Sequence, residues 1–78
     1  DGRNDLFRPK SVGYRAYKYF RVFNRLGEMV YETETIGDGW DGRYKGHKAD
    51  LGTYFWLLSA EDKDGKVFQK KGDVVLIR

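Results

Sequence analysis

The sequence predicts a small antiparallel all-β domain. Helical periodicity is absent from the 78 residues, and the apolar residues instead form short runs rich in Tyr, Phe, Val and Trp. Glycine-containing clusters separate these runs and supply the turns between them. The length suits a single domain over residues 1–78, with strands expected at 14–24, 28–35, 52–62 and 66–78 and a short piece near 43–46.

Two hairpin turns of the same kind join the long strands in pairs. In "FNRLGEMV", Asn24 begins a type I turn that Gly27 ends in the left-handed region, and Asp62 and Gly65 have the same roles in "EDKDGKVF". The first turn sets Val22 opposite Val30, Phe23 opposite Met29 and Arg21 opposite Tyr31. The second turn sets Ala60 opposite Phe68 and Glu61 opposite Val67.

Alternation of side chains along the strands predicts the core. The residues expected to share a buried face are Tyr54, Trp56, Leu58 and Ala60 in one strand, and Phe20, Val22 and Val30 in the first hairpin.

The last strand has apolar residues on both faces. Val75 and Ile77 lie on one face and Val74 and Leu76 on the other, so we expect cover on both sides. Gly72 is expected to interrupt this strand with a β-bulge.

Trp40 stands among four glycines in "GDGWDGRYKG", residues 37–46. Glycine permits positive φ and the close approach of another chain segment. We therefore expect a tight loop to fold over the indole, so that Trp40 closes one end of the β-structure.

Composition excludes several classes of site and partner. The chain has no cysteine, so neither a disulfide nor a thiolate metal site can brace it. No apolar run approaches the roughly 20 residues of a membrane span. The net charge of +3 is spread along the chain, with Lys70 and Lys71 as the only adjacent basic pair. This pattern disfavours nucleic acid as a partner, including single strands bound by an OB-type surface.

No catalytic set is visible in the sequence. The single histidine, His47, lies between Gly46 and Lys48, without the partners that a zinc site or a nucleophile–base pair needs. Ser11 and Ser59 have no neighbouring base in the sequence. We therefore expect a domain that is not an enzyme and holds no cofactor.

Two weaker patterns leave a binding function open. Asp1, Asn4 and Asp5 in "DGRND" form part of a calcium-ligand set, although an Asx-type turn explains them without a metal. Asp38 and Asp41 beside Trp40 are likewise better explained as turn caps.

Tyrosines along the strands suggest a second kind of binding surface. Tyr17, Tyr19 and Tyr31 could form an exposed platform for sugars, although cross-strand packing is the simpler explanation. The alternative function is thus a surface carbohydrate-binding or calcium-dependent adhesion module.

The order of the motifs resembles one known family. "DGRNDLFRP", "YFRVFNRLGEMVYET", "GWDGRYKG", "LGTYFW" and "DKDGKVFQKKGDVVLIR" follow one another as in the gliding-motility-associated C-terminal domain, the type B sorting domain of the type IX secretion system. The resemblance covers essentially the whole chain and implies an immunoglobulin-like β-sandwich. Within it, "GWDGRYKG" and "LGTYFW" also resemble immunoglobulin-like modules such as that of the flagellar hook-capping protein, and they supply a structural motif of Trp40, Asp41, Gly42, Gly52 and Tyr54.

The chain departs from the family pattern at two places. The family usually has tryptophan where Leu26 stands in "FNRLG". Its pattern also begins upstream with a Phe–x–Pro–Asn–Gly-like run, which predicts a truncated first strand here and an open sheet edge. An open edge favours strand-mediated self-association.

The resemblance implies a secretion signal without chemistry of its own. An N-terminal passenger with its own leader would reach the periplasm, and the type IX machinery there would recognise the folded domain and guide the passenger through the outer membrane. The destination would be the cell surface or the medium. We expect the partner to contact the last strand and the first hairpin turn, at Asn24, Arg25, Gly27, Lys70, Lys71, Leu76, Ile77 and Arg78, by adding a strand to the sheet edge.

Overall fold

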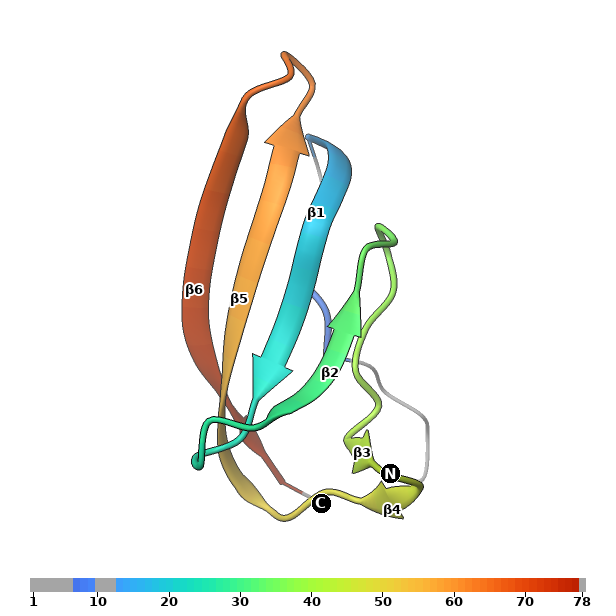
Figure 1. The fold of residues 1–78 in the computed structure, drawn as a ribbon, viewed down its shortest axis with the longest axis vertical. Helices are drawn as coiled ribbons and strands as arrows, with labels where there is room; N and C mark the ends of the chain where they lie inside the picture. The colour runs from blue at the N-terminus through green and yellow to red at the C-terminus, as the bar shows by residue number, and fades with distance from the viewer. Residues whose placement is uncertain (1–6, 10–12, 78) are drawn as a thin grey trace.

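The computed structural model describes residues 7–9 and 13–77, which form strands and turns but no helix. Four strands make one antiparallel sheet in the order β2–β1–β5–β6 (Figure 1). Their bounds are β1 Tyr14–Phe23, β2 Met29–Thr33, β5 Gly52–Asp62 and β6 Val67–Leu76. The predicted long strands are therefore confirmed to within two residues, and the piece near 43–46 is a small hairpin of β3 (Arg43–Tyr44) and β4 (His47–Lys48).

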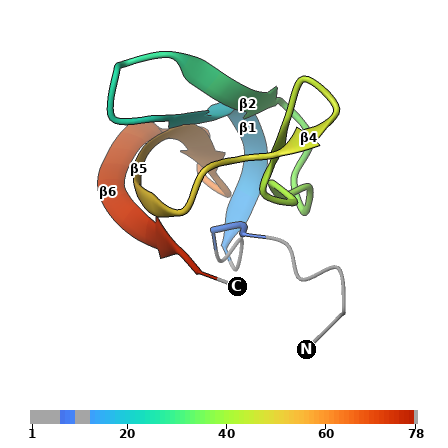
Figure 2. The ribbon, with the colours of Figure 1, turned by 90° about the horizontal axis from the view of Figure 1, so that it is seen from below.

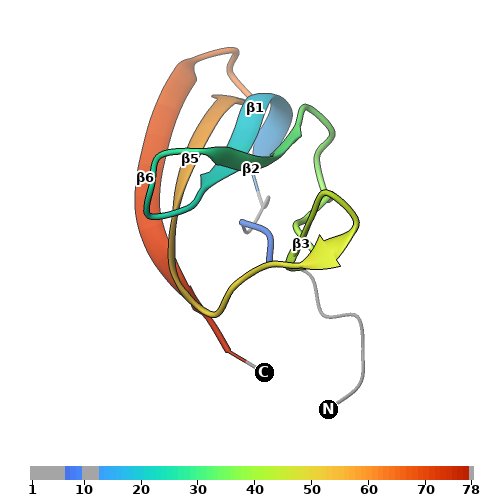
Figure 3. The ribbon, with the colours of Figure 1, turned by 60° about the horizontal axis from the view of Figure 1, so that its bottom comes forward.

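The sheet is curved, and a second layer faces its concave side (Figure 2). This layer consists of the β3–β4 hairpin and an isolated bridge between Phe7 and Trp40 (Figure 3). In the bridge, the N–H of each residue donates to the carbonyl of the other at 2.8 Å. The arrangement is that of a small immunoglobulin-like sandwich, as the resemblance predicted.

The core lies between the two layers. Its buried side chains are Tyr17, Phe20, Val22, Trp40, Ala49, Tyr54, Leu58 and Ala60. Trp56 and Val30 are half-buried and pack against this cluster. The faces predicted by alternation are thus confirmed.

Trp40 closes the sandwich in the predicted way. Its side chain is 2% exposed, its ring centroid lies 4.8 Å from that of Tyr54, and its Nε1–H donates to the Arg43 carbonyl at 2.9 Å. The loop turns over the ring at Gly42, whose φ is +80° and whose carbonyl accepts from the Ala49 N–H. The glycines are therefore needed for the path of the loop.

The two hairpin turns are equivalent, as predicted. Asn24 Oδ1 accepts from the Leu26 and Glu28 N–H groups, and Asp62 Oδ1 accepts from the corresponding N–H groups of Asp64 and Lys66. Gly27 and Gly65 have φ of +85° and +82°. The predicted pairs of the second hairpin, Ala60 with Phe68 and Glu61 with Val67, are confirmed.

The predicted register of the first hairpin is correct only next to its turn. Phe23 faces Met29, but Val22 faces Tyr31 and Arg21 faces Glu32, because Val30 is an extra residue in β2. This bulge corrects the predicted pairs of Val22 with Val30 and Arg21 with Tyr31. It turns Tyr31 towards the core, where its ring centroid lies 6.2 Å from that of Phe20.

Gly72 does not form the predicted bulge. The β5–β6 ladder runs without a register shift from Glu61 and Val67 to Gly52 and Leu76, and Gly72 lies directly opposite Trp56. A Cβ at position 72 would lie 2.8 Å from Cζ2 of the indole. The glycine is therefore required for close packing and not for a bend.

Candidate functional site: an apolar end of the sheet

The predicted recognition residues fall on two parts of the sheet. Leu76 pairs with Gly52 and Phe23 pairs with Phe55, so the Asn24 turn and the end of β6 lie at the same end of the sheet, at the bottom of Figure 1. Lys70 and Lys71 lie near the middle of β6, away from this end of the sheet, opposite Leu58 and Leu57. Arg78 lies outside the described residues.

Between the two predicted segments the structure reveals an apolar surface. We call it the end patch, and it comprises Leu26, Met29, Leu51, Phe55, Val75 and Ile77, all of which are exposed. Leu26, Val75 and Ile77 are 85%, 60% and 78% exposed. The prediction that β6 is covered on both faces is therefore wrong, since of the apolar residues Val74–Ile77 only Val74 and Leu76 pack against the core.

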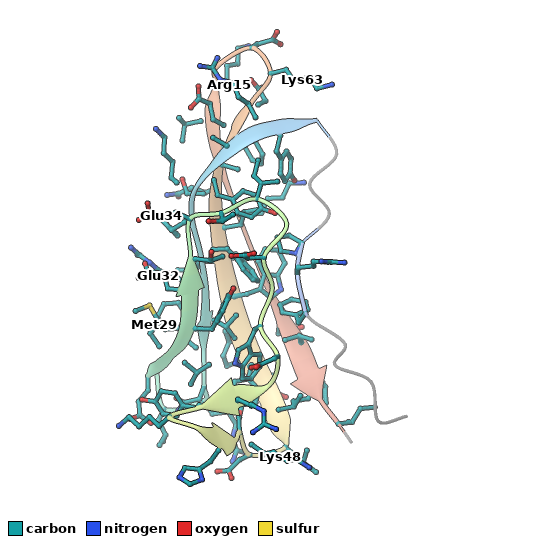
Figure 4. The ribbon with its side chains drawn as sticks, turned by 90° about the vertical axis from the view of Figure 1, so that its right-hand side faces the viewer. Arg15, Met29, Glu32, Glu34, Lys48 and Lys63 are labelled. Atoms are coloured by element: carbon teal, nitrogen blue, oxygen red, sulfur yellow. The ribbon has the colours of Figure 1, made fainter. Side chains whose placement is uncertain are left out.

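Part of the end patch forms a row across the sheet. Met29, Phe23 and Phe55 follow one another across β2, β1 and β5 on the convex face, and Val75 is a diagonal neighbour of Phe55 on β6. Figure 4 shows Met29 projecting from β2 on the same side as Glu32. At the turn, Leu26 and Leu51 line one shallow hollow of 100 Å³.

Charged side chains border the end patch along the sheet. Arg21 Nε lies 2.6 Å from Glu32 Oε2, and the guanidinium lies 3.9 Å from the ring centroid of Tyr19. Leu57, which is 37% exposed, lies between Arg21 and Lys71 in the cross-strand row. An apolar surface with a charged border is typical of a protein interface.

Sequence reasoning missed Met29, Leu51, Phe55 and Leu57 as surface residues. The sequence contained a signal for Phe55 and Leu57. Residues 54–58 are apolar at every position, and a sheet that packs against the core with one face only leaves every second side chain of such a strand exposed. The bulge at Val30, which fixes the orientation of the rest of β2, has no comparable signal.

The three tyrosines do not form an exposed platform. Tyr17 is 6% exposed in the core and Tyr31 packs on Phe20, whereas Tyr19 lies under Arg21 on the other face. β1 has a register shift between Tyr17 and Tyr19, which moves these residues out of simple alternation. The predicted exposure of Tyr17 is therefore wrong.

Titratable and nucleophilic groups are dispersed over the described residues. His47 is exposed at the start of β4, and Ser59 is buried between the cross-strand neighbours Tyr19 and Gln69. Within residues 7–9 and 13–77, no three His, Cys, Asp or Glu side chains are grouped to hold a metal ion. Ser11 and the calcium candidates Asp1, Asn4 and Asp5 lie outside the described residues, so a calcium site there remains a prediction.

The two aspartates beside Trp40 have hydrogen bonds within their turns. Asp41 Oδ1 accepts from the Arg43 N–H at 3.0 Å, and Asp38 Oδ2 accepts from the Thr33 hydroxyl at 3.3 Å. These contacts match the turn-capping interpretation.

Burial perturbs two tyrosine hydroxyls. Desolvation, and to a smaller extent the neighbouring Tyr14, raises the pKa of Tyr17. Desolvation also raises the pKa of Tyr31, against the effect of a hydrogen bond with Thr33. In both cases burial favours the neutral phenol over the phenolate.

Comparison with known proteins gives one family match. The model of the CHU_C family, described as the type IX secretion signal domain, matches residues 1–76. No curated protein and no solved structure gives a significant match. Within the described residues, no helix is long and apolar enough to cross a membrane.

Proposed function

Since the chain belongs to the type IX secretion signal domain family, we propose that it is a non-catalytic C-terminal sorting domain. Its passenger, attached at the N-terminal side, passes through the periplasm and leaves through the type IX secretion system for the cell surface or the medium. The family match over residues 1–76 is the observation that carries this proposal.

The proposed signal is a surface of the folded domain. The end patch supplies apolar area for a partner, and the Asn24 turn lies beside it, where Leu26 and Leu51 line the same hollow. Lys70 and Lys71 add positive charge along β6, and Arg78 follows this strand in the sequence, so the charge steers an acidic partner. Recognition of this kind needs no reactive group in the domain.

A reporter fusion tests the proposal. A reporter with a leader is placed before the chain and expressed in a bacterium that has a type IX system, and the exported fraction is measured with and without the chain. We expect export only with the chain. Equal export of the reporter without the chain would contradict the proposed function.

Substitutions on one strand test the proposed surface. Removing residues 74–78 would also delete Val74 and Leu76, which pack against the core. The better variant combines Val75→Ser with Ile77→Ser, because both side chains are exposed and their loss should change stability by only about 0.5 kcal/mol. Val67→Ser is the matched control, since Val67 is 56% exposed on the same strand but at the opposite end of the sheet.

We expect the double variant to stay folded and to lose export, while Val67→Ser is exported as the unchanged chain is. Full export of a folded Val75→Ser/Ile77→Ser variant would remove the end patch from the proposal.

A further inference from the structure

The hydrogen bonds of the second hairpin fix which backbone groups of β6 are unpaired. The Asp62 N–H donates to the Lys66 carbonyl at 2.9 Å, so these two residues form a hydrogen-bonded pair. Bonded and non-bonded pairs alternate along an antiparallel ladder, and the β5–β6 ladder has no register shift. The residues whose N–H and C=O groups point away from β5 are therefore Val67, Gln69, Lys71, Asp73 and Val75.

These five residues line the free edge of the sheet. β6 is the last strand in the sheet order, and its edge is visible at the left of Figure 1. Within the described part of the chain, no backbone hydrogen bond joins this edge to another segment. A ten-residue edge of this kind can pair with an added strand.

The edge is chemically different in its two halves. The half nearer the turn contains Lys66, Lys70 and Lys71, whereas the other half runs from Val74 to Ile77 and is apolar. Lys70 and Lys71 are consecutive in the strand, so they place positive charge on both faces of the sheet. An added strand therefore complements this edge best if it has acidic residues at one end and apolar residues at the other.

A hollow lies beside the apolar half. It has a volume of 260 Å³ and is lined by Val74–Leu76 of β6, by Ile77 directly after this strand, and by Phe7 and Trp40–Gly42 of the second layer. Side chains of an added strand alternate between the two faces. One that points to the concave face beside Val74 and Leu76 would enter this hollow, and an apolar side chain suits its lining.

We propose that the β6 edge binds an extended segment of a partner protein with an acidic half opposite Lys66–Lys71 and an apolar half opposite Val74–Ile77. The backbone groups of Gln69, Lys71 and Asp73 hold the segment, and its apolar side chain in the hollow beside Trp40 gives selectivity. This inference rests on the proposed function, because the secretion machinery would supply the segment.

Synthetic peptides test the proposal directly. Two ten-residue peptides rich in β-branched residues are used, one with three glutamates at the amino end and one with three glutamates at the carboxyl end. Both are needed because the charge pattern fixes which half of the segment is acidic but not whether the segment runs parallel or antiparallel to β6. Peptides with lysine in place of glutamate are the charge controls. We expect one glutamate peptide to bind, with slower hydrogen exchange at the amides of Gln69, Lys71 and Asp73, and the lysine peptides to bind at least about tenfold more weakly.

A pair of variants at one position separates backbone pairing from charge. Lys71→Pro removes an N–H that points to solvent and leaves the pairing of β6 with β5 intact, whereas Lys71→Ala removes only the charge. We expect Lys71→Pro to abolish peptide binding and Lys71→Ala to weaken it by about threefold to tenfold. Gln69→Pro has the same design if Lys71→Pro does not fold, and the hydrogen-exchange measurement needs no variant.

Three results would overturn the inference. The first is unchanged peptide binding by a folded Lys71→Pro variant, and the second is equal binding of the lysine and glutamate peptides. The third is a dimer of the chain that Lys71→Pro disrupts, with no peptide binding, which would assign the edge to a second copy.

The fusion assay keeps this inference separate from the proposed function. Export that depends on the chain but is unchanged by Lys71→Pro would overturn strand addition and leave the sorting function intact. Export that does not depend on the chain would contradict the sorting function itself.

Discussion

Gly72 lies directly beneath the indole of Trp56, its cross-strand neighbour in the β5–β6 ladder. Glycine weakens the interior of a strand, because it has more conformational freedom to lose and no side chain to pack. Here the aromatic ring covers the glycine and continues towards Phe7 and Phe20, at centroid distances of 6.4 Å from each. This pair is one of the contacts that join the edge strand to the core, together with those of Phe68, Val74 and Leu76.

The Gly72→Ala variant tests this contact. Its Cβ would lie 2.8–2.9 Å from three atoms of the Trp56 ring, so the indole must move away from its neighbours. We expect the free energy of unfolding in urea to fall by about 1–3 kcal/mol. Lys70→Ala, at an exposed position of the same strand, is the control and should change it little. Equal stability of Gly72→Ala and the unchanged chain would show that the ring does not constrain this position.

Trp40→Ala should be the most destabilising single change. It removes a fully enclosed ring between the two layers, and we expect a loss of about 3–5 kcal/mol in urea unfolding. Trp40→Phe keeps an aromatic ring but loses the Nε1–H donated to the Arg43 carbonyl, so its effect should be smaller. An unchanged melting temperature of Trp40→Ala would contradict the role of the indole in closing the sandwich.

The matched turns allow a comparison of two equivalent substitutions. Asn24→Ala and Asp62→Ala each remove an oxygen that accepts from two backbone N–H groups. We expect each to lower the free energy of unfolding by about 1–2 kcal/mol. Asn24→Asp keeps the acceptor but loses the Nδ2–H that donates to Glu28 Oε1 at 2.8 Å and sets a second carboxylate beside Glu28, so we expect an intermediate loss of stability. Thermal unfolding measures all three. A harmless Asn24→Ala would mean that Gly27 alone specifies the turn.

Tyr17→Phe should not destabilise the domain at neutral pH. The Tyr17 hydroxyl is buried and has no hydrogen-bond partner among the described residues, so its removal relieves a desolvation penalty. We expect the free energy of unfolding to stay equal or to rise by about 1 kcal/mol. A clear loss of stability at pH 7 would reveal a partner for this hydroxyl.

The same variant should alter the alkaline stability profile. Because burial raises the pKa of Tyr17 in the folded state, the native state favours the neutral phenol. The part of the free energy of unfolding that comes from this raised pKa is complete below the ordinary tyrosine pKa of about 10. It disappears as the pH rises through the folded-state pKa. Tyr17→Phe should therefore lose less stability between neutral and strongly alkaline pH than the unchanged chain.

Local chemistry made much of the fold predictable. The sequences from Asn24 to Gly27 and from Asp62 to Gly65 specify their turns through side-chain acceptors and left-handed glycines, and both hairpins form. The bulge at Val30 could not be predicted in this way, because it depends on the packing of Tyr31 against Phe20 across the sheet. The role of Gly72 likewise depends on Trp56, a residue far away in the sequence.

The candidate site was predictable only in part. The last strand and the Asn24 turn follow from the family motifs, and the structure places both at one end of the sheet. The end patch between them requires the register of β2, β1 and β5, which brings Met29, Phe23 and Phe55 into one row. Phe55 is far from the other two residues in the sequence, so the row could not be predicted without the pairing of the strands.

The most direct test of the account asks whether the sorting signal is a folded surface or a linear stretch of sequence. A reporter fused to the Trp40→Ala chain keeps every residue of β6, and its exported fraction is compared with that of the unchanged fusion at a temperature where only the variant is unfolded. We predict that export is lost, because the unfolded chain no longer presents the end patch and the β6 edge together. Equal export of the unfolded variant would contradict the account, since the secretion machinery would then read the sequence and not the shape.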